Sequence, residues 1–284
     1  MLIGAHISSA GSFPKAAGKA ARLGMNCAQH FTRNPRGGRQ RSIDPREAEA
    51  FIRAREELGI RVVVMHTPYT VNLASNRPEV VAFARRAIRE DVQRCHLLEI
   101  PYLVLHPGSH VGDGIPRGTE RIVEGLRGII DEARPALEGG VRILLEMMAG
   151  SGSEIGSTPG ELATILEGID GSPHVGLCLD TCHSFARGYA LGDEKGLESY
   201  LGEIQEVLGL DRVCVVHLND SKGLRGGRRD RHARMGRGNI GRQGLTRIVN
   251  HPALRHLPFV LEVPVDEEEE YGEEVALVKS WRVD

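Results

Sequence analysis

The feature that most constrains this sequence is a strand-then-helix pattern that recurs eight times. Each unit starts with a short apolar run of strand-forming residues and continues with a longer stretch of helical spacing. The predicted strands are Leu2–His6, Cys27–Phe31, Arg61–His66, Tyr102–His106, Arg142–Glu146, Val175–Asp180, Val213–His217 and Phe259–Glu262. Near-continuous apolar strands are typical of a parallel sheet covered by helices. Eight units in 284 residues leave about 35 residues for each, a natural size for one strand and one helix.

This alternation predicts an α/β chain folded as a (β/α)8 TIM barrel, with the active site at the C-terminal ends of the strands. No linker or low-complexity stretch divides the chain, so we expect a single domain over residues 1–284. The alternative is a doubly wound open sheet, but no Gly-x-Gly-x-x-Gly motif follows the first strand to support it. The expected helices include Pro45–Leu58, opened by Ser42 or Asp44, and Pro78–Leu98, opened by Ser75 or Asn76.

The charge of the chain is small in sum but unevenly distributed. The 36 basic and 38 acidic residues give a net charge of −2, which by itself does not favour a nucleic-acid partner. Residues 1–42 nevertheless contain seven basic residues and no acidic one, and residues 217–247 contain nine basic residues against two acidic ones. Basic blocks of this kind suit an anionic partner, although a solvated surface is the alternative.

The start of the chain and its cysteines indicate the compartment. Residues 1–13 lack a basic segment followed by an apolar one, and no run approaches about 18 apolar residues, so we expect neither a secretion signal nor a membrane partner. Five cysteines form no even disulfide framework, and we expect reduced, buried thiols. These features predict a cytoplasmic protein.

Six of the eight predicted strands finish on a side chain that can bind a metal. These residues are His66, His106, Glu146, Asp180, His217 and Glu262. A single His or Glu at a strand end is often a cap or a core group, but these six follow the spacing of the repeat itself. Because all strand ends of a barrel face one mouth, we expect the six side chains to converge there.

Two further clusters follow these strands. His183 comes three residues after Asp180, and Asp230 and His232 lie in the loop beyond His217. The total is nine candidate ligands, and since one zinc ion needs three or four, nine imply two or three ions bridged by carboxylates. Imidazole with carboxylate suits zinc or manganese. His6 is either a supporting group or a packing residue.

Clustered divalent ions favour hydrolysis of phosphoesters. Zinc lowers the pKa of bound water to about 7, and paired ions stabilise the attacking and leaving oxygens at phosphorus. One alternative is a metal-dependent sugar isomerase or epimerase, whose site would be richer in carboxylates and would want a Lys at a strand end; no predicted strand ends in Lys. Another is a catalytically silent metal-dependent DNA-binding protein.

Three long segments resemble the signatures of the endonuclease IV family, and the resemblance covers essentially the whole chain. The segments are His66–Ser75 (HTPYTVNLAS), Gly176–Tyr189 (GLCLDTCHSFARGY), and His217–Lys222 (HLNDSK) followed by Asp230–His232, Gly236, Gly238 and Gly241. The resemblance implies a TIM-barrel deoxyribonuclease IV that cleaves double-stranded DNA on the 5′ side of abasic sites, leaving 3′-hydroxyl and 5′-deoxyribose phosphate ends. We expect a monomer.

The resemblance also implies three zinc ions, with manganese possible in one or more sites. The first ion would be held by His66, His106 and Glu146, the second by Glu146, Asp180, His217 and Glu262, and the third by His183, Asp230 and His232. Glu146 would be catalytic, by orienting or deprotonating the attacking water. These nine ligands are the same nine that the strand pattern and the two clusters indicate.

The family's DNA contacts carry over to two residues. Arg36 matches a residue that enters the duplex, and Tyr69 matches an aromatic wedge that fills the base stack when the abasic nucleotide is extruded. The sequence departs from the family at Thr70, where a bulkier apolar residue is usual, and at Met147 and Met148, where we expect Asn and Thr.

Overall fold

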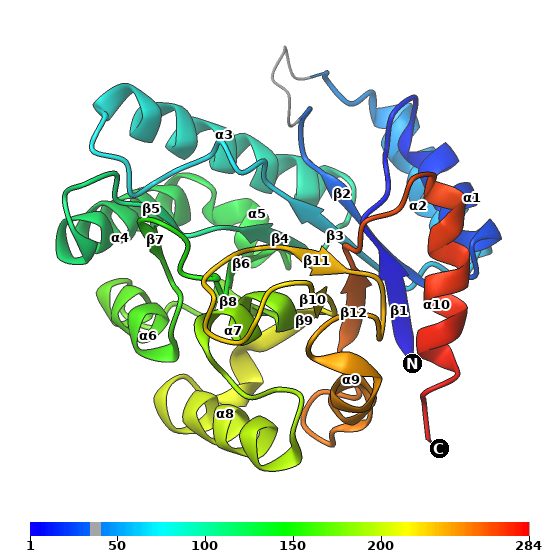
Figure 1. Cartoon of the computed structure of the whole chain (residues 1–284). Helices are drawn as coiled ribbons and strands as arrows, with labels where there is room; N and C mark the ends of the chain where they lie inside the picture. The colour runs from blue at the N-terminus through cyan, green and yellow to red at the C-terminus, as the bar shows by residue number, and fades with distance from the viewer. Residues whose placement is uncertain (35–40, 284) are drawn as a thin grey trace.

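Eight parallel strands form one sheet in the computed structural model, which describes residues 1–34 and 41–283 (Figure 1). The sheet order is β1-β12-β9-β8-β6-β4-β3-β2. The strands are β1 (Leu2–Ala5), β2 (Cys27–Phe31), β3 (Val62–His66), β4 (Tyr102–Leu105), β6 (Arg142–Glu146), β8 (Val175–Asp180), β9 (Val213–His217) and β12 (Pro258–Leu261). A parallel bridge between His6 and Gln29 joins β1 to β2 and closes the sheet into a barrel. The predicted TIM barrel is therefore confirmed.

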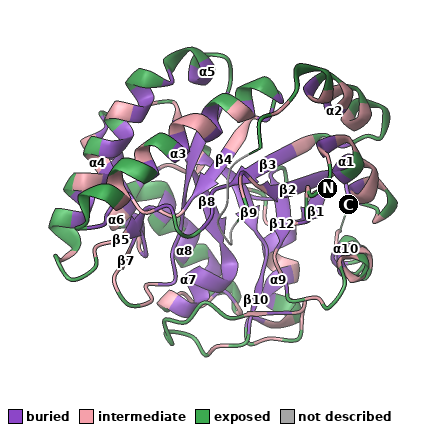
Figure 2. Ribbon diagram, turned by 90° about the horizontal axis from the view of Figure 1, so that it is seen from above, coloured by how far each residue is buried: buried purple, intermediate pink, exposed green. Residues whose placement is uncertain are grey.

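Helices surround the strands and bury them (Figure 2). They are α1 (Phe13–Arg22), α2 (Pro45–Glu57), α3 (Pro78–Leu97), α4 (Ile115–Glu132), α5 (Arg134–Glu138), α6 (Pro159–Gly168), α7 (Thr181–Arg187), α8 (Glu194–Val207), α9 (Gly241–Asn250) and α10 (Tyr271–Lys279), with 3₁₀ turns η1 (Leu210–Arg212) and η2 (Glu268–Glu270). Within the described ranges, none of these helices is long and apolar enough to cross a membrane.

The two helix starts predicted from the sequence differ in how far they follow local capping rules. Asp44, one of the two residues expected to open α2, accepts a hydrogen bond from the Arg46 backbone N–H, and Pro45 takes the first helical position. The expected cap of α3 was wrong, because the helix begins after Arg77, which makes no side-chain capping bond. Ser75 instead accepts a hydrogen bond from the Arg77 N–H in the preceding turn.

Apolar side chains form two cores. The larger core fills the space between strands and helices. The smaller one fills the inside of the barrel and consists of Cys27, Val64, Val104, Leu144, Cys178, Cys214, Val215 and Val260. The wall is tight at Gly4, where a Cβ atom would lie 1.7 Å from the carbonyl oxygen of Cys27. Only glycine therefore allows β1 to approach β2 closely enough for closure.

Two short two-stranded sheets lie in the loops. β5 (Gly108–Ser109) pairs with β7 (Glu154–Ile155), and β10 (Asp220–Ser221) pairs with β11 (His232–Ala233). The second of these joins the segment just after β9 to His232, a member of the predicted loop cluster. Three strands also end one residue earlier than expected, so that His6, His106 and Glu262 directly follow β1, β4 and β12 rather than closing them.

Candidate metal centre

A layer of polar side chains lies directly above the inner apolar core. Seven residues of that core are each followed, two positions later along the chain, by Gln29, His66, His106, Glu146, Asp180, His217 or Glu262. Side chains two residues apart on a strand point the same way, so these seven enter the barrel mouth together. The structure thus brings together the six strand-end residues predicted from the sequence.

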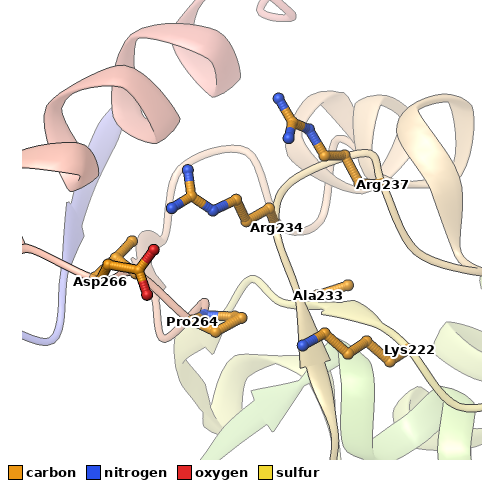
Figure 3. A pocket seen from close by; sticks show the side chains of 7 residues that line it. Lys222, Ala233, Arg234, Arg237, Pro264 and Asp266 are labelled. Atoms are coloured by element: carbon orange, nitrogen blue, oxygen red, sulfur yellow. The ribbon is translucent and has the colours of Figure 1, made fainter.

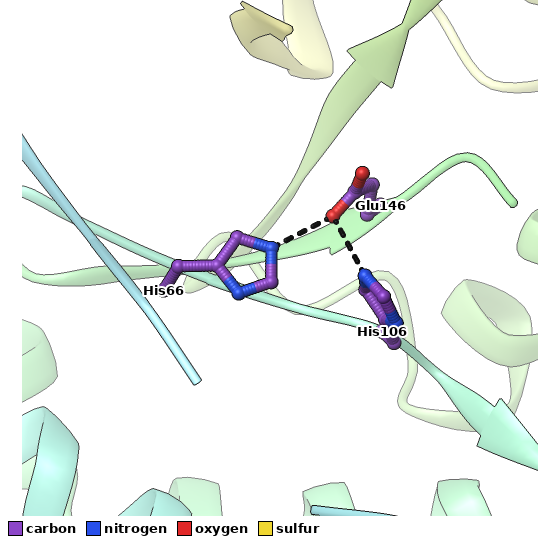
Figure 4. Close-up of side chains that lie close together, drawn as sticks. All are labelled: His66, His106 and Glu146. Carbon is purple, nitrogen blue, oxygen red and sulfur yellow. Dashed lines mark hydrogen bonds and ion pairs between the residues drawn. The ribbon is translucent and has the colours of Figure 1, made fainter. Parts of the chain in front are cut away.

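The first group of donors meets at one oxygen of Glu146 (Figure 4). His66 Nε2 lies 2.9 Å and His106 Nε2 lies 3.3 Å from Glu146 Oε2. The other ring nitrogen of His66, Nδ1, is 2.6 Å from the carbonyl oxygen of Thr67. Because a carbonyl only accepts, this contact places the His66 proton on Nδ1 and turns the Nε2 lone pair toward the group.

The second group lies on the other side of the same carboxylate. His217 Nδ1 is 3.2 Å from Glu146 Oε1 and 3.4 Å from Glu262 Oε2, and it is 4.0 Å from Asp180 Oδ2. The donor atoms of Glu146, Asp180, His217 and Glu262 all lie within 4.8 Å of one another. The two oxygens of Glu146 therefore face two different groups.

The third group lies at the edge of the mouth. His183 stands in the first turn of α7, and its Nε2 is 3.4 Å from Asp230 Oδ2. His232 lies in β11, and its Nε2 is 3.0 Å from Asp230 Oδ1. The Nδ1 atoms of the two rings reach the carbonyl oxygens of Met147 and Glu262 at 3.0 Å and 2.9 Å. The structure thus brings the remaining three predicted residues together in a group of their own.

A buried carboxylate holds the hairpin that carries this group. Asp220 accepts hydrogen bonds from the backbone N–H groups of Ser221, Gly238 and Ile240 at 2.8, 2.8 and 3.0 Å. A Cβ atom at Gly238 would lie 2.5 Å from Asp220 Oδ1, so the approach needs glycine. These bonds fix the strand pair from which His232 projects.

The acids of the site are held in their charged form by histidines. Burial alone would raise the pKa of Glu146, but His217 and His106 lower it well below its usual range. Burial likewise opposes ionisation of Asp230, and the hydrogen bonds of His183 and His232 lower its pKa. Asp180 differs, because burial outweighs its neighbours and raises its pKa.

The histidines of the third group are held in their protonated form when only protein atoms surround them. Burial lowers the pKa of His232, yet Asp230 and the charge of Asp180 more than reverse this and raise it to about 9. Burial also opposes protonation of His183, whose pKa is nevertheless raised well above its usual value by Asp180 and Asp230. Such a concentration of carboxylate around imidazole is what a cation would neutralise.

The donor set fits divalent metal ions. The His66–His106–Glu146, Glu146–Asp180–His217–Glu262 and His183–Asp230–His232 groups each have donor atoms within 4.8 Å of one another. His183 Nε2 and His232 Nε2 are buried, and both face the carboxylate of Asp230. Two ring nitrogens that converge on one carboxylate in a buried site are arranged as ligands of a single cation would be. Imidazole with carboxylate is the donor chemistry of zinc and related ions.

Two cysteines lie beside this centre but fit it less well. Cys182 lies within reach of Asp180 and His232. Burial raises the pKa of the Cys182 and Cys178 thiols to about 12. Burial therefore disfavours the thiolate, the form that a metal binds, in both.

The mouth is a cavity with an aromatic side chain on its rim. The cavity has a volume of about 380 Å³ and is lined by seven of the nine candidate ligands, while Asp180 and His217 lie beneath it. Tyr69 also lines it and is 70 % exposed, so this ring projects toward solvent. Arg36, the other predicted DNA contact, lies outside the described residues.

A second cavity, of about 360 Å³, adjoins β11 and is rich in positive charge (Figure 3). Lys222, Arg234 and Arg237 line it on the hairpin side, and Asp266 lies on the facing segment. Arg234 is ion-paired with Glu270, whereas Lys222 and Arg237 are exposed. The segment 224–231, which contains four arginines, is exposed along its whole length.

Sequence reasoning missed two amides in the centre. Asn219 donates from Nδ2 to Asp180 Oδ2 at 2.6 Å and accepts the Glu262 backbone N–H on Oδ1 at 2.8 Å. Gln29 contacts both His217 and Glu262. Two features of the sequence could have indicated them. Asn219 follows His217 by two positions, and Gln29 is a polar residue in the otherwise largely apolar strand Cys27–Phe31.

His6, which the sequence left as either a supporting group or a packing residue, contacts the centre. Its Nδ1 is 3.3 Å from Glu262 Oε1.

Met147 and Met148, which replace expected polar residues, are both buried, and the backbone carbonyl of Met147 orients the His183 ring. Thr70 is exposed beside Tyr69.

Comparisons with known proteins agree with this architecture. The profile of the family described as Xylose isomerase-like TIM barrel matches residues 17–281. A probable endonuclease 4 from Methanoculleus marisnigri is 44 % identical over 267 residues, which cover 94 % of each chain. The crystal structure of endonuclease IV from Thermus thermophilus superimposes with a TM-score of 0.86 at 34 % identity, covering 99 % of this chain and 98 % of that one. A D-tagatose 3-epimerase-like protein shares the fold, with a TM-score of 0.73 at 20 % identity over 99 % of this chain and 97 % of that one.

Proposed function

This chain belongs to the endonuclease IV family, and we propose that it is a DNA repair enzyme that hydrolyses the phosphodiester bond 5′ to abasic sites. The products are a 3′-hydroxyl and a 5′-deoxyribose phosphate. The observation that carries the proposal is the set of three donor groups at the barrel mouth, two of which share Glu146. Multinuclear centres of this type suit in-line displacement at phosphorus.

We propose that the centre holds three zinc ions, with manganese as a possible substitute. The first is assigned to His66, His106 and Glu146, the second to Glu146, Asp180, His217 and Glu262, and the third to His183, Asp230 and His232. Bound zinc supplies a Lewis acid that lowers the pKa of water and neutralises negative charge at the phosphate. The donor types support this assignment, as do the two buried ring nitrogens of His183 and His232 that converge on Asp230.

Glu146 is assigned the catalytic role. It is almost completely buried, and the lowered pKa of its carboxyl group keeps it ionised at neutral pH. An ionised carboxylate at the centre of the mouth can accept a hydrogen bond from the attacking water and orient it toward phosphorus. The surrounding carbonyls and amides hold the ring donors in place, so that little reorganisation is needed when substrate binds.

The substrate is double-stranded DNA with an abasic site. Tyr69 stands exposed on the rim, where its ring can stack against bases and fill the space left by the missing base. Arg36 is assigned a neighbouring contact on the resemblance of its segment. Lys222, Arg237 and the arginines of 224–231 are exposed beside the mouth and supply the positive charge that duplex phosphates require.

A sugar isomerase or epimerase remains the alternative function of such a barrel. The likeness to the epimerase-like structure is one of fold, at 20 % identity. The centre described above contains five histidines and a third donor group, whereas polarising one sugar carbonyl needs one or two ions. The donor set therefore favours phosphoester hydrolysis.

The remaining assignments follow from this substrate. We propose that residues 1–284 act as one domain and as a monomer, because one barrel provides all nine ligands. Because its proposed substrate is cellular DNA, we also propose a cytoplasmic location.

The test uses a duplex with one tetrahydrofuran residue, an abasic analogue that cannot undergo β-elimination. Zinc-loaded protein is expected to nick it once, on the 5′ side, and the nick should carry a 3′-hydroxyl that a DNA polymerase extends. Complete removal of zinc by a chelator should abolish nicking, and added zinc should restore it. The variant His251→Gln, which alters a histidine paired with Glu198 outside the centre, serves as the matched control and should nick normally. Intact duplex after incubation with metal-replete protein would refute the function.

A further inference from the structure

Gln29 stands in the same polar layer as the six strand-end donors. It follows the inner-core residue Cys27 by two positions on β2, as each of those donors follows its own core residue. Its side chain is completely buried. It belongs to none of the donor groups, yet both ends of its amide contact them.

The charge of Glu262 determines how the Gln29 amide is oriented. Gln29 Nε2 lies 2.7 Å from Glu262 Oε1. An ionised carboxylate only accepts hydrogen bonds, so the atom that faces it must be the amide NH₂ group. A flipped amide would bring two oxygens into that same close contact. The carbonyl oxygen Oε1 of Gln29 must therefore point the other way, toward His217.

This orientation in turn determines the tautomer of His217. Gln29 Oε1 lies 2.8 Å from His217 Nε2. Since an amide oxygen only accepts, His217 Nε2 must carry a proton. In the neutral ring the lone pair is then on Nδ1, the atom that faces Glu146 and Glu262.

His217 differs in this respect from the other histidines of the centre. His66, His183 and His232 each direct Nδ1 to a backbone carbonyl and present Nε2 to their donor group. His217 presents Nδ1 and directs Nε2 to a side chain. The tautomer of His217 therefore depends on the side chain of Gln29, which a substitution can remove, rather than on a backbone carbonyl.

We propose that Gln29 is a positioning residue that, oriented by Glu262, holds His217 as the Nε2–H tautomer and so presents Nδ1 to the second metal ion. The proposal rests on the metal centre of the proposed function. It adds a residue that touches no reacting atom and acts only through two ligands.

The tautomer can be read directly in the unmodified, zinc-loaded protein. Nitrogen-15 NMR of selectively labelled histidine distinguishes protonated, metal-bound and free ring nitrogens. We expect four metal-bound rings that are ligated through Nε2 and one, His217, ligated through Nδ1 with a proton on Nε2. Five rings ligated through Nε2 would overturn the proposal. This readout needs no DNA cleavage, so it stands apart from any failure of the proposed activity.

The variant Gln29→Met removes the hydrogen bonds to Glu262 and His217, together with the contact of Gln29 Nε2 with His6 Nδ1, at nearly constant volume. We expect the affinity for one of the three zinc ions, measured by competition with a chromogenic chelator, to fall about 10- to 100-fold. The Nε2 proton of His217, which would no longer be hydrogen-bonded to Gln29, should also exchange faster with water than in the parent protein. The matched control is Thr32→Val, which removes a buried hydroxyl just after β2 that makes no hydrogen bond within the described residues and keeps the backbone bond of Thr32 to the His66 carbonyl. Equal zinc affinities in Gln29→Met and the control would overturn the proposal, and should Gln29→Met not fold, the spectrum of the unmodified protein decides.

Discussion

The carboxylate of Asp180 caps the helix that carries His183. Asp180 Oδ1 accepts a hydrogen bond of 2.7 Å from the His183 backbone N–H, while Oδ2 stays in the second donor group and accepts a hydrogen bond from Asn219. One side chain therefore does two things: it contributes charge to the second group, and it starts the turn of α7 that aims His183 at the third.

Two substitutions of Asp180 should separate these roles. Asn is as good a helix cap as Asp, so Asp180→Asn should weaken binding of the second ion and leave the third in place. Asp180→Ala should also lose the cap, at a cost of about 0.5–2 kcal/mol of stability, and should weaken both ions. Zinc content per chain and thermal unfolding measure the difference. Asp193→Ala, which removes the cap of α8 away from the centre, should lower stability but not zinc content. Equal zinc losses in the two Asp180 variants would contradict this account.

Glu146→Gln tests the catalytic assignment. The substitution keeps the shape of the side chain but removes its charge, and cleavage of abasic duplex should fall by at least about 10²-fold, the lower end for loss of a positioned acid or base. Its circular dichroism should stay that of the parent. The exposed residue Glu198 provides the control, because Glu198→Gln should cleave at the parental rate. A Glu146→Gln rate within a few-fold of the parent would exclude the role.

Zinc binding should depend on pH through the third group. The pKa of His232 in the metal-free protein is raised from 6.5 to about 9, and zinc binds only the neutral ring. Zinc affinity should therefore rise between pH 6.5 and 9, with proton release that calorimetry in buffers of different ionisation enthalpy can count. The contact of His232 with Asp230 stabilises the metal-free fold fully below pH 6.5, and this contribution is lost as pH rises through about 9. An affinity that is flat over this range would show that His232 binds no metal.

Tyr69 should act through its ring alone. Tyr69→Ala should weaken binding to abasic duplex by about 1–3 kcal/mol, the worth of one stacked aromatic, with little effect on intact duplex. Tyr69→Phe keeps the ring and should bind like the parent. Because Tyr69 is 70 % exposed, neither change should lower the unfolding temperature. The wedge role fails if the Ala variant discriminates abasic from intact duplex as well as the parent does.

The barrel and the six strand-end candidates could be predicted because both depend on local periodicity, whereas His183, Asp230 and His232 were found as clusters just beyond the strands. The alternation of strands determines which side chains point inward, so that Val64 and His66, or Cys178 and Asp180, share one direction. The helix starts were less predictable, since Ser75 lies in the turn before α3 and does not cap it. Such choices depend on the tertiary path of the chain rather than on residue type.

The eight-fold alternation and the six strand-end candidates were thus determined by the sequence itself, because a repeat of constant period and a two-residue alternation are properties of the chain alone. The spacing of the residues did not say how the donors divide into groups; the family resemblance implied a division, and the tertiary structure gives its physical cause. Glu146 joins two groups because its two oxygens face His66 and His217 from opposite sides, and Gln29 reaches the site only because β1 and β12 close the sheet beside β2. Closure brings together residues that lie far apart in the sequence, and the distances between them depend on register and on the charge of each neighbour, which no local pattern contains.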